Sequence, residues 1–291
     1  MNYIVLNSID ELMATVDKAK KEFKKYMFIA GGTDVMVSMK SRRALFSAID
    51  YLIDVANIKE MKGIKEMDDK VWIGAATTVE ELRASPVIKR WFSAIHEASE
   101  RFATWQIRNV ATIGGNICTS SPASSLAPAL LVYDAEVEIA SPQDKKYVPL
   151  KDFFVGPKKN ILQSDEVVTG VVIKKRDKIK GAYEELGKRE GNIIPIVNCA
   201  VALDLYSEND KTVIKEAKIA LGSVSPTPVR TPTAENFLKG KKATFEVIEE
   251  GSKKILSDIN PITDFRASKE YRQNIAVVLV KRALSKLVEV R

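Results

Sequence analysis

The sequence predicts an α+β protein, built from a two-part α/β region followed by a smaller C-terminal α+β domain. Helix-like and strand-like segments alternate through the first 175 residues, which is typical of α/β units. Beyond residue 176, two long strand-like segments come first and helices follow, which is the order of an α+β domain. We therefore expect one region over 1–175, itself divided into about 1–56 and 57–175, and a second domain over 176–291.

The first unit begins with an amphipathic helix over 8–25. Ser8 and Glu11 have the spacing of a capping box, and apolar residues recur every three or four positions behind them. The apolar run YMFIA (26–30) then ends abruptly at GGTD, which predicts a strand followed by a tight turn. YLIDV (51–55) is predicted to be a second buried strand, which completes a small α/β unit.

The second unit repeats this alternation. Thr78 and Glu81 predict a capped short helix after a strand, and Pro86 opens a longer helix whose apolar stripe reaches Phe102. A helix and two strands are predicted further along, at 126–134, 135–140 and 166–173.

The C-terminal part has a different order of predicted elements. After a basic, polar stretch at 174–180, two strands are predicted, and the prolines of SVSPTPVRTPT form a loop. The chain then finishes with two predicted helices. These strands and helices lie at 196–206, 212–224, 244–257 and 268–289.

Composition excludes several classes of function. Two cysteines, Cys118 and Cys199, cannot supply the four thiolates of an iron–sulfur cluster, and one histidine excludes a histidine-rich metal site. The net charge of +7 comes from scattered lysines without a nucleic-acid motif, so we expect no nucleic-acid partner. No apolar run approaches the ~20 residues of a membrane span, and no signal peptide is legible, so we expect a cytoplasmic protein.

Two glycine pairs stand out, in FIAGGTD (28–34) and ATIGGN (111–116). Each follows an apolar run and ends in small polar residues. Glycine permits positive φ and close approach, and successive N–H groups can form an anion-binding nest. Local chemistry alone leaves two interpretations open, which are cofactor nests and ordinary tight turns. The same holds for Thr119 to Ser121, whose hydroxyls can bind a ligand or their own backbone.

Longer segments around these pairs resemble a known family. FIAGGTDVMVSMK (28–40) and QIRNVATIGGNICTSSPAS (106–124) are similar, in this order and about 80 residues apart, to the flavin-binding subunit of the molybdenum hydroxylases. That family includes xanthine dehydrogenases, aerobic carbon monoxide dehydrogenases and related aldehyde or nicotinate hydroxylases. Shorter matches extend the resemblance over essentially the whole chain, at 149–154, 165–173 and 271–284.

The resemblance implies that the α/β region holds extended FAD and that the C-terminal domain combines an antiparallel sheet with helices. By position, Ala30 to Asp34 would wrap the diphosphate and ribityl chain, and Thr112 to Asn116 would form a second nest. Val168 and Lys188 match positions that approach the flavin ring. The expected cofactor-binding residues are Phe28, Ile29, Ala30, Gly31, Gly32, Thr33, Asp34, Val35, Phe102, Ala111, Thr112, Ile113, Gly114, Gly115, Asn116, Ser125, Val168 and Lys188.

One position departs from the family pattern. The family commonly has an aspartate nine residues after the asparagine of GGN, and here that residue is Ser125. Serine is shorter and uncharged, so the contact is expected to be lost, water-mediated or rearranged.

The resemblance further implies an electron-transfer subunit. A large partner subunit would carry molybdopterin, a small one the [2Fe–2S] clusters, and FAD here would pass electrons to NAD⁺, oxygen or another small-molecule acceptor. We expect a doubled heterotrimer, with no catalytic acid–base set and no metal site on this chain. Two alternatives stay open: a stand-alone FAD-dependent oxidase or reductase, and a cofactor-free scaffold subunit.

Overall fold

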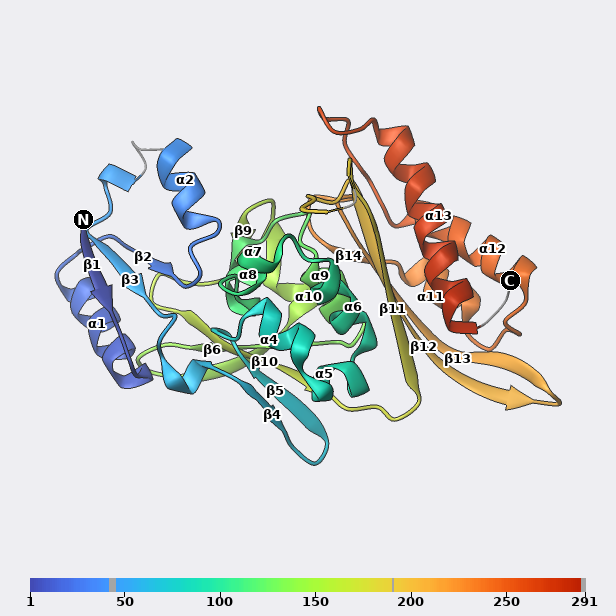
Figure 1. Ribbon diagram of the computed structural model, residues 1–291, viewed down its shortest axis with the longest axis horizontal. Coiled ribbons are helices and arrows are strands. Elements are labelled where there is room, and N and C mark those ends of the chain that lie inside the picture. The colour runs from blue at the N-terminus through green and yellow to red at the C-terminus, as the bar shows by residue number, and fades with distance from the viewer. Residues whose placement is uncertain (42–45, 190, 289–291) are drawn as a thin grey trace.

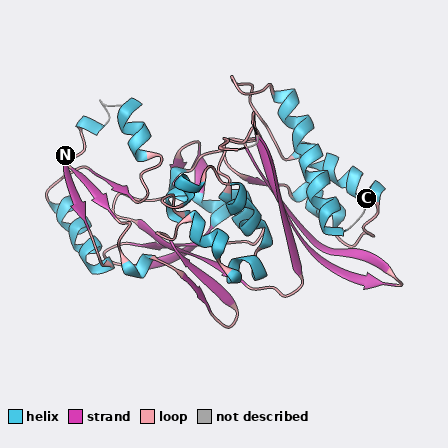
Figure 2. Ribbon diagram, in the orientation of Figure 1, coloured by secondary structure: helices cyan, strands magenta, loops and turns pink. Residues whose placement is uncertain are grey.

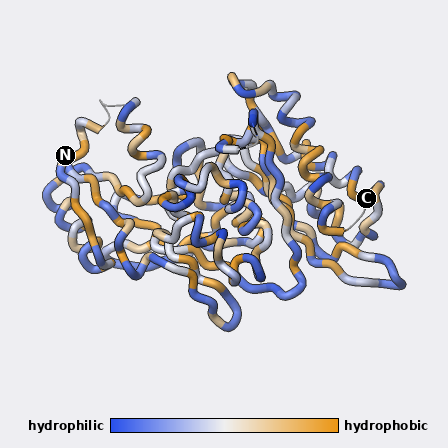
Figure 3. The backbone as a smooth tube through the Cα atoms, in the orientation of Figure 1, coloured by the Kyte–Doolittle hydropathy of each residue, from blue (hydrophilic) through white to orange (hydrophobic). Residues whose placement is uncertain are grey.

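The computed structural model describes residues 1–41, 46–189 and 191–288. Three sheets follow one another along the long axis of the molecule, from the N-terminal sheet at one end to the C-terminal sheet and its helices at the other (Figure 1). Helices and strands are both abundant (Figure 2), and the predicted α+β class is confirmed. Hydrophobic residues run along the strands, whereas the β4–β5 and β12–β13 hairpin tips are hydrophilic (Figure 3).

The N-terminal sheet has three parallel strands in the order β1-β3-β2. Ser8 caps the first helix by accepting a hydrogen bond from the Glu11 N–H, and the Glu11 carboxylate accepts from the Asn7 N–H. The helix buries Leu12 and Val16 against the sheet. The elements here are β1 (Asn2–Val5), α1 (Ile9–Lys21), β2 (Tyr26–Ile29), α2 (Val35–Ser41) and β3 (Tyr51–Asp54).

The middle sheet has five antiparallel strands in the order β4-β5-β10-β6-β7. Its strands are β4 (Ile64–Glu66), β5 (Lys70–Gly74), β6 (Glu136–Ala140), β7 (Lys145–Pro149) and β10 (Val167–Lys174), with β8 (Phe154–Gly156) and β9 (Lys159–Asn160) forming a separate hairpin. The helical segments are η1 (Lys59–Met61), α4 (Val79–Ala84), α5 (Pro86–Trp91), α6 (Ser93–Arg101), α7 (Trp105–Arg108), α8 (Ile113–Thr119), α9 (Leu126–Leu131) and α10 (Leu150–Phe153).

The predicted long helix from Pro86 to Phe102 is wrong, because it is divided at Phe92. Phe92 leaves helical geometry, with φ −136° and ψ 61°, and its buried ring packs edge-on against Tyr133. An apolar stripe continues across the break, so the periodicity alone could not reveal it.

The C-terminal sheet has four antiparallel strands in the order β11-β12-β13-β14, and the helices of the same domain cover one of its faces. Its strands are β11 (Ile179–Leu186), β12 (Val197–Glu208), β13 (Lys211–Gly222) and β14 (Val229–Arg230), and its helical segments are α11 (Pro232–Leu238), α12 (Phe245–Lys254), η2 (Ile255–Ser257) and α13 (Lys269–Val288). Neither β11, which begins within the polar stretch, nor α11, which begins at the last proline of the predicted loop, was predicted from the sequence.

Alternate residues of the C-terminal sheet belong to different cores. Tyr183, Ala200 and Ala202 join the core of the middle region, whereas Ala182, Cys199 and Val201 pack with the C-terminal helices. This period of two is what a strand buried on both faces produces. The middle helices α6 and α9 lie against the first of these faces, so this sheet is covered on both sides.

Helix α6 also covers the open edge of β11. The Ser93 hydroxyl donates to the Gly181 carbonyl (2.7 Å) and accepts from its N–H (3.0 Å), and the Glu97 carboxylate accepts from the Tyr183 N–H at 2.8 Å. One helical turn further along, Arg101 pairs with Glu184 at 3.2 Å. Residues four apart share a helix face, so one face of α6 satisfies an edge that would otherwise be unpaired.

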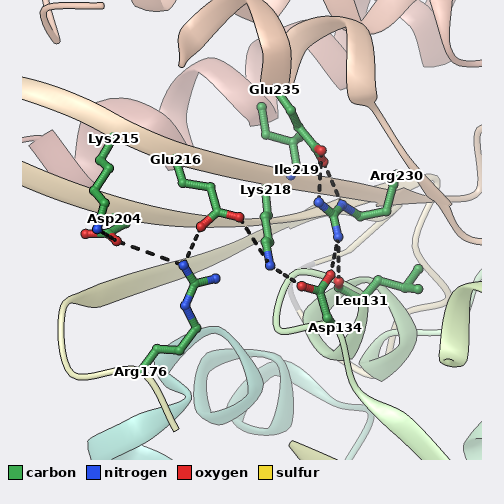
Figure 4. Close-up of polar contacts among 10 residues, drawn as sticks. All are labelled: Leu131, Asp134, Arg176, Asp204, Lys215, Glu216, Lys218, Ile219, Arg230 and Glu235. Atoms are coloured by element: carbon green, nitrogen blue, oxygen red, sulfur yellow. Dashed lines mark hydrogen bonds and ion pairs between the residues drawn. The ribbon is translucent and has the colours of Figure 1, made fainter. Parts of the chain in front are cut away.

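Ion pairs join the middle region to the C-terminal sheet near β14 (Figure 4). Arg230 donates to the Leu131 carbonyl (3.0 Å) and to Asp134 (2.8 Å), and it pairs with Glu235 at 2.6 Å. Asp134 also accepts from the largely buried Lys218. The positive charge of the Arg230 guanidinium therefore balances the negative charges of two carboxylates, Asp134 in the middle region and Glu235 in the C-terminal domain.

We expect Arg230→Met to lower the free energy of unfolding by about 2 kcal/mol, because it leaves Glu235 and Asp134 without their shared partner in a partly buried site. Urea denaturation at neutral pH measures the change. The exposed Arg282 on α13 supplies the control, and Arg282→Met should change stability by no more than about 0.5 kcal/mol. Equal losses in the two variants would contradict the stabilising role of Arg230.

Arg272 on α13 ties three loops together at one end of the C-terminal sheet. The guanidinium donates to the carbonyls of Ile196 (2.6 Å) and Ser223 (3.1 Å) and to the carboxylate of Asp264 (2.7 Å). Burial favours a raised pKa for Asp264, but the N–H groups of Arg266 and Ala267 and the charge of Arg272 outweigh it and lower the pKa to about 2.

Because the folded-state pKa of Asp264 lies below its unfolded value of about 3.9, the stabilisation is present above pH ~4 and is lost as the pH falls toward about 2. We expect Asp264→Asn to melt below the unsubstituted protein at pH 7, and the difference to shrink between pH ~4 and ~2. Thermal melts over that pH range measure it, with Asp68→Asn in the exposed β4–β5 turn as the control. A difference independent of pH would contradict the assignment.

Candidate functional site

A cleft of about 1090 Å³ lies where the N-terminal, middle and C-terminal parts of the chain meet. The first glycine segment and α2 form one wall, the segment from Phe102 to Ser125 forms the floor, and loops of the C-terminal domain close the other side. In volume it suits an extended ligand larger than a single metabolite.

Most of the predicted cofactor-binding residues line this cleft. They are Phe28, Ala30, Gly31, Gly32, Thr33, Asp34, Val35, Phe102, Ala111, Thr112, Gly115, Asn116 and Ser125. The structure thus brings together two segments that are far apart in the sequence.

Five predicted residues do not line the cleft. Ile29, Ile113 and Val168 are buried in the core, and Gly114 packs against Ala75. Lys188 is exposed and donates to the Phe265 carbonyl at 3.2 Å, with its ammonium 5.8 Å from the Phe265 ring.

The first glycine segment forms a turn between β2 and α2. Gly32 has φ +70°, a left-handed conformation that disfavours a side chain, and a Cβ on Gly31 would lie 1.7 Å from the Val110 carbonyl oxygen. In the described part of the chain, the N–H groups from Gly31 to Asp34 have no protein acceptor. Their arrangement beside the cleft has the character of an anion nest.

The second glycine segment is the first turn of α8, and the predicted second nest is not formed there. The Ile113 N–H donates to the Thr77 carbonyl, Gly114 to that of Ala75, and Gly115 to the Thr112 hydroxyl. All three donors are therefore already used. Gly114 is required for packing, since a Cβ there would lie 2.7 Å from the Ala75 carbonyl oxygen, whereas Gly115 borders the cleft and leaves it open.

The hydroxyl residues at the C-terminal end of α8, from Thr119 to Ser121, do not all support the same interpretation. Ser120 is buried, and its hydroxyl bonds the carbonyls of Ile117 and Cys118, so this side chain satisfies its own backbone. Thr119 and Ser121 line the cleft.

Cations outnumber carboxylates along the cleft. Lys158, in the turn between β8 and β9, pairs with Asp34 across the opening at 3.0 Å, and Asp264 is held by Arg272. The charged residues that line it are Lys158, Arg189, Arg266 and Arg272 against Asp34 and Asp264. This excess of positive charge suits an anionic ligand.

The C-terminal wall was missed by the sequence analysis. It consists of Arg189, of residues from the segments 192–195, 223–226 and 260–266, and of Arg272. Arg272, which the helical pattern suggests is a surface residue, is only 3% exposed. The prolines of SVSPTP and the charged residues of TDFRAS were the available signals, but no local rule assigns such loops to a site formed by distant segments.

Histidine, cysteine and carboxylate side chains in the described ranges form no group of three or more that could hold a metal ion. None of the helices described combines the length and apolar composition needed to cross a membrane. Burial raises the pKa of the Cys118 thiol to about 12, so this cleft residue stays protonated at neutral pH.

Family models match nearly the whole chain. Residues 1–174 match the FAD-binding domain in molybdopterin dehydrogenase, and residues 182–287 match the C-terminal domain of the carbon monoxide dehydrogenase flavoprotein. Within curated relatives, the putative xanthine dehydrogenase FAD-binding subunit of Escherichia coli K12 is 32% identical over 263 residues, which cover 89% of this chain and 88% of the relative.

Solved structures agree with this match. The carbon monoxide dehydrogenase of Hydrogenophaga pseudoflava has a chain that superposes with a TM-score of 0.89 at 29% identity, covering 98% of this chain and 96% of the other. The curated carbon monoxide dehydrogenase medium chain of the same organism is 28% identical over 284 residues, which cover 97% of this chain and 95% of the relative. The chain therefore belongs to the molybdopterin dehydrogenase flavoproteins, as an FAD-binding subunit of the molybdenum hydroxylase family.

Proposed function

We propose that the cleft holds FAD and that this chain passes electrons from an iron–sulfur partner subunit to a small-molecule acceptor. The observation that carries the proposal is the turn from Gly31 to Asp34, whose N–H groups border the cleft and have no acceptor among the described residues. The diphosphate of FAD is an anion of the kind that such a nest binds.

The residues present fit the cofactor in size and charge. Gly31 and Gly32 leave the backbone of this turn without side chains, and the Lys158 ammonium lies beside it, paired with Asp34. Gly115 and Asn116 border the continuation of the cleft along α8. The diphosphate is assigned to the first segment alone, because the N–H groups of Ile113, Gly114 and Gly115 in the second segment already donate to protein acceptors.

When bound, a flavin supplies transfer of electrons singly or in pairs. The residues that line the cleft would hold and orient the flavin and would fix the charges around it. Asp34 and Asp264 are both engaged in ion pairs, and the Cys118 thiol is protonated. The lining thus supports a role in holding a cofactor rather than in attacking a substrate.

The expected partner subunits are inferred from the relatives of this chain. The word "medium" in the name of the carbon monoxide dehydrogenase relative supports an assembly with a small iron–sulfur subunit and a large molybdenum-binding subunit. We assign the chain to a doubled heterotrimer of this kind, in which NAD⁺, oxygen or another small molecule accepts the electrons.

We expect the purified chain to absorb near ~370 and ~450 nm and to release FAD at about one per chain on denaturation. Gly115→Val should reduce the FAD content at least about tenfold, because its side chain enters the cleft. Gly156→Val is the matched control, since no atom lies within 4 Å of a Cβ at that position. Release of FMN would contradict the diphosphate assignment, and a chain that takes up no FAD would leave the scaffold alternative.

We expect the isolated, FAD-loaded chain to oxidise no substrate of its complex. In the intact complex, absorption at ~450 nm should bleach when substrate is added anaerobically and recover when the acceptor is added. Anaerobic titration of both preparations measures this. Turnover by the isolated chain would instead support a stand-alone oxidase or reductase.

A further inference from the structure

The second glycine segment offers the cleft a side chain rather than its backbone. The N–H groups of Ile113, Gly114 and Gly115 already donate to protein acceptors. The Asn116 N–H donates to the Thr112 carbonyl at 2.9 Å, while its side chain lines the cleft. Donors that this segment presents to a ligand must therefore come from side chains, and the Asn116 amide carries two N–H donors on one nitrogen.

A buried serine fixes the direction in which this amide faces. The hydroxyl of Ser124 donates to the Asn116 amide oxygen at 2.5 Å and accepts from the Ala127 N–H at 3.1 Å. A hydroxyl carries a single proton, and here that proton is directed at the amide oxygen. The amide nitrogen occupies the other branch of the side chain, and its N–H groups have no acceptor among the described residues.

Ser124 is itself held from two sides. Its carbonyl accepts from the side-chain amide of Asn198 at 3.0 Å, and Asn198 lies on β12 with no exposed surface. Two residues earlier, the Pro122 carbonyl accepts from the Ser223 N–H at 2.7 Å. The C-terminal domain thus fixes the backbone of this segment, and the start of α9 fixes the Ser124 hydroxyl. A side chain locked in this way is a rigid support for the residue it contacts.

The floor of the cleft around Asn116 is uncharged. The residues that line it between Phe102 and Ser125 are apolar or carry hydroxyl, thiol or amide groups. The cations that line the cleft, Lys158 and three arginines, all lie outside this segment. With the diphosphate placed at the first glycine turn, the amide donors of the floor suit the neutral acceptors of an extended ligand, such as hydroxyl and carbonyl oxygens.

We propose that Ser124 is a positioning residue, which holds the Asn116 amide so that its N–H groups donate to neutral acceptors of FAD in the cleft. The inference rests on the proposed function, because it assigns a role within the same site. Without the Ser124 hydroxyl, the amide can rotate about its last bond and present its oxygen instead. Two acceptors that face each other make no hydrogen bond, so FAD binding would weaken although Ser124 need not touch the cofactor.

The test is a double-mutant cycle on FAD affinity, in which the full chain freed of FAD is titrated with FAD and the flavin fluorescence is followed. We expect Asn116→Ala to weaken binding about tenfold and Ser124→Ala about fivefold. In the Asn116→Ala background, Ser124→Ala should change the affinity by less than about twofold, because the group through which it acts has gone. A serine that contacted FAD directly, or only supported α9, would lose the same factor in both backgrounds, which would overturn the proposal.

Ser120→Ala is the matched control for the loss of a buried serine hydroxyl. Ser120 lies in the same segment, but its hydroxyl bonds the carbonyls of Ile117 and Cys118 rather than the Asn116 amide. This variant should keep the FAD affinity within about twofold of the unsubstituted chain, even if its melting temperature falls.

Asn116→Asp tests the direction of the amide. One carboxylate oxygen can still accept from Ser124, whereas the other replaces the N–H donors at nearly the same size. We therefore expect FAD binding to weaken at least about tenfold. Binding as tight as in the unsubstituted chain would mean that the amide N–H groups are not used, and it would overturn the proposal.

The remaining outcomes separate this proposal from the proposed function. A chain that takes up no FAD would overturn the proposed function and the positioning role with it. Equal losses in the two backgrounds, in a chain that does bind FAD, would overturn the positioning role alone. If Ser124→Ala does not fold, Ser124→Cys completes the cycle, since a thiol is similar in size but a much weaker donor.

Discussion

The cleft exists because the backbone at Gly31 lies directly against the backbone at Val110. A single added carbon at Gly31 would sit 1.7 Å from the Val110 carbonyl oxygen, so the N-terminal and middle regions cannot approach in this way with any other residue. The same contact aligns the bare turn after β2 with the start of α8. The position of both glycine segments along one cleft follows from this close approach.

The third wall depends on interactions of another kind. The C-terminal sheet is fixed to the middle region by hydrogen bonds from α6 to the edge of β11 and by the ion pairs of Arg230. Arg272 then holds the loops that face the cleft. Apolar packing supplies most of the cohesion, while these directional contacts set how the sheet is oriented over the site.

The sequence predicted the parts of this arrangement that are local. The Ser8 cap, the turn at Gly32 and the order of strands and helices all depend on neighbouring residues. The occupied N–H groups of α8 could not be foreseen, since their acceptors, Ala75 and Thr77, lie some forty residues earlier. The burial of Arg272 was hidden for a similar reason, because its partners are carbonyls of distant loops and carry no side-chain signature.

The cover that α6 gives to β11 bears on how such subunits can be recombined. A C-terminal domain taken from this chain without α6 would present an unpaired strand edge, which is a template for association with other chains. Grafting between relatives would therefore need to carry the helix along with the sheet. In this protein the unit of modular exchange is larger than the sequence segment that forms the domain.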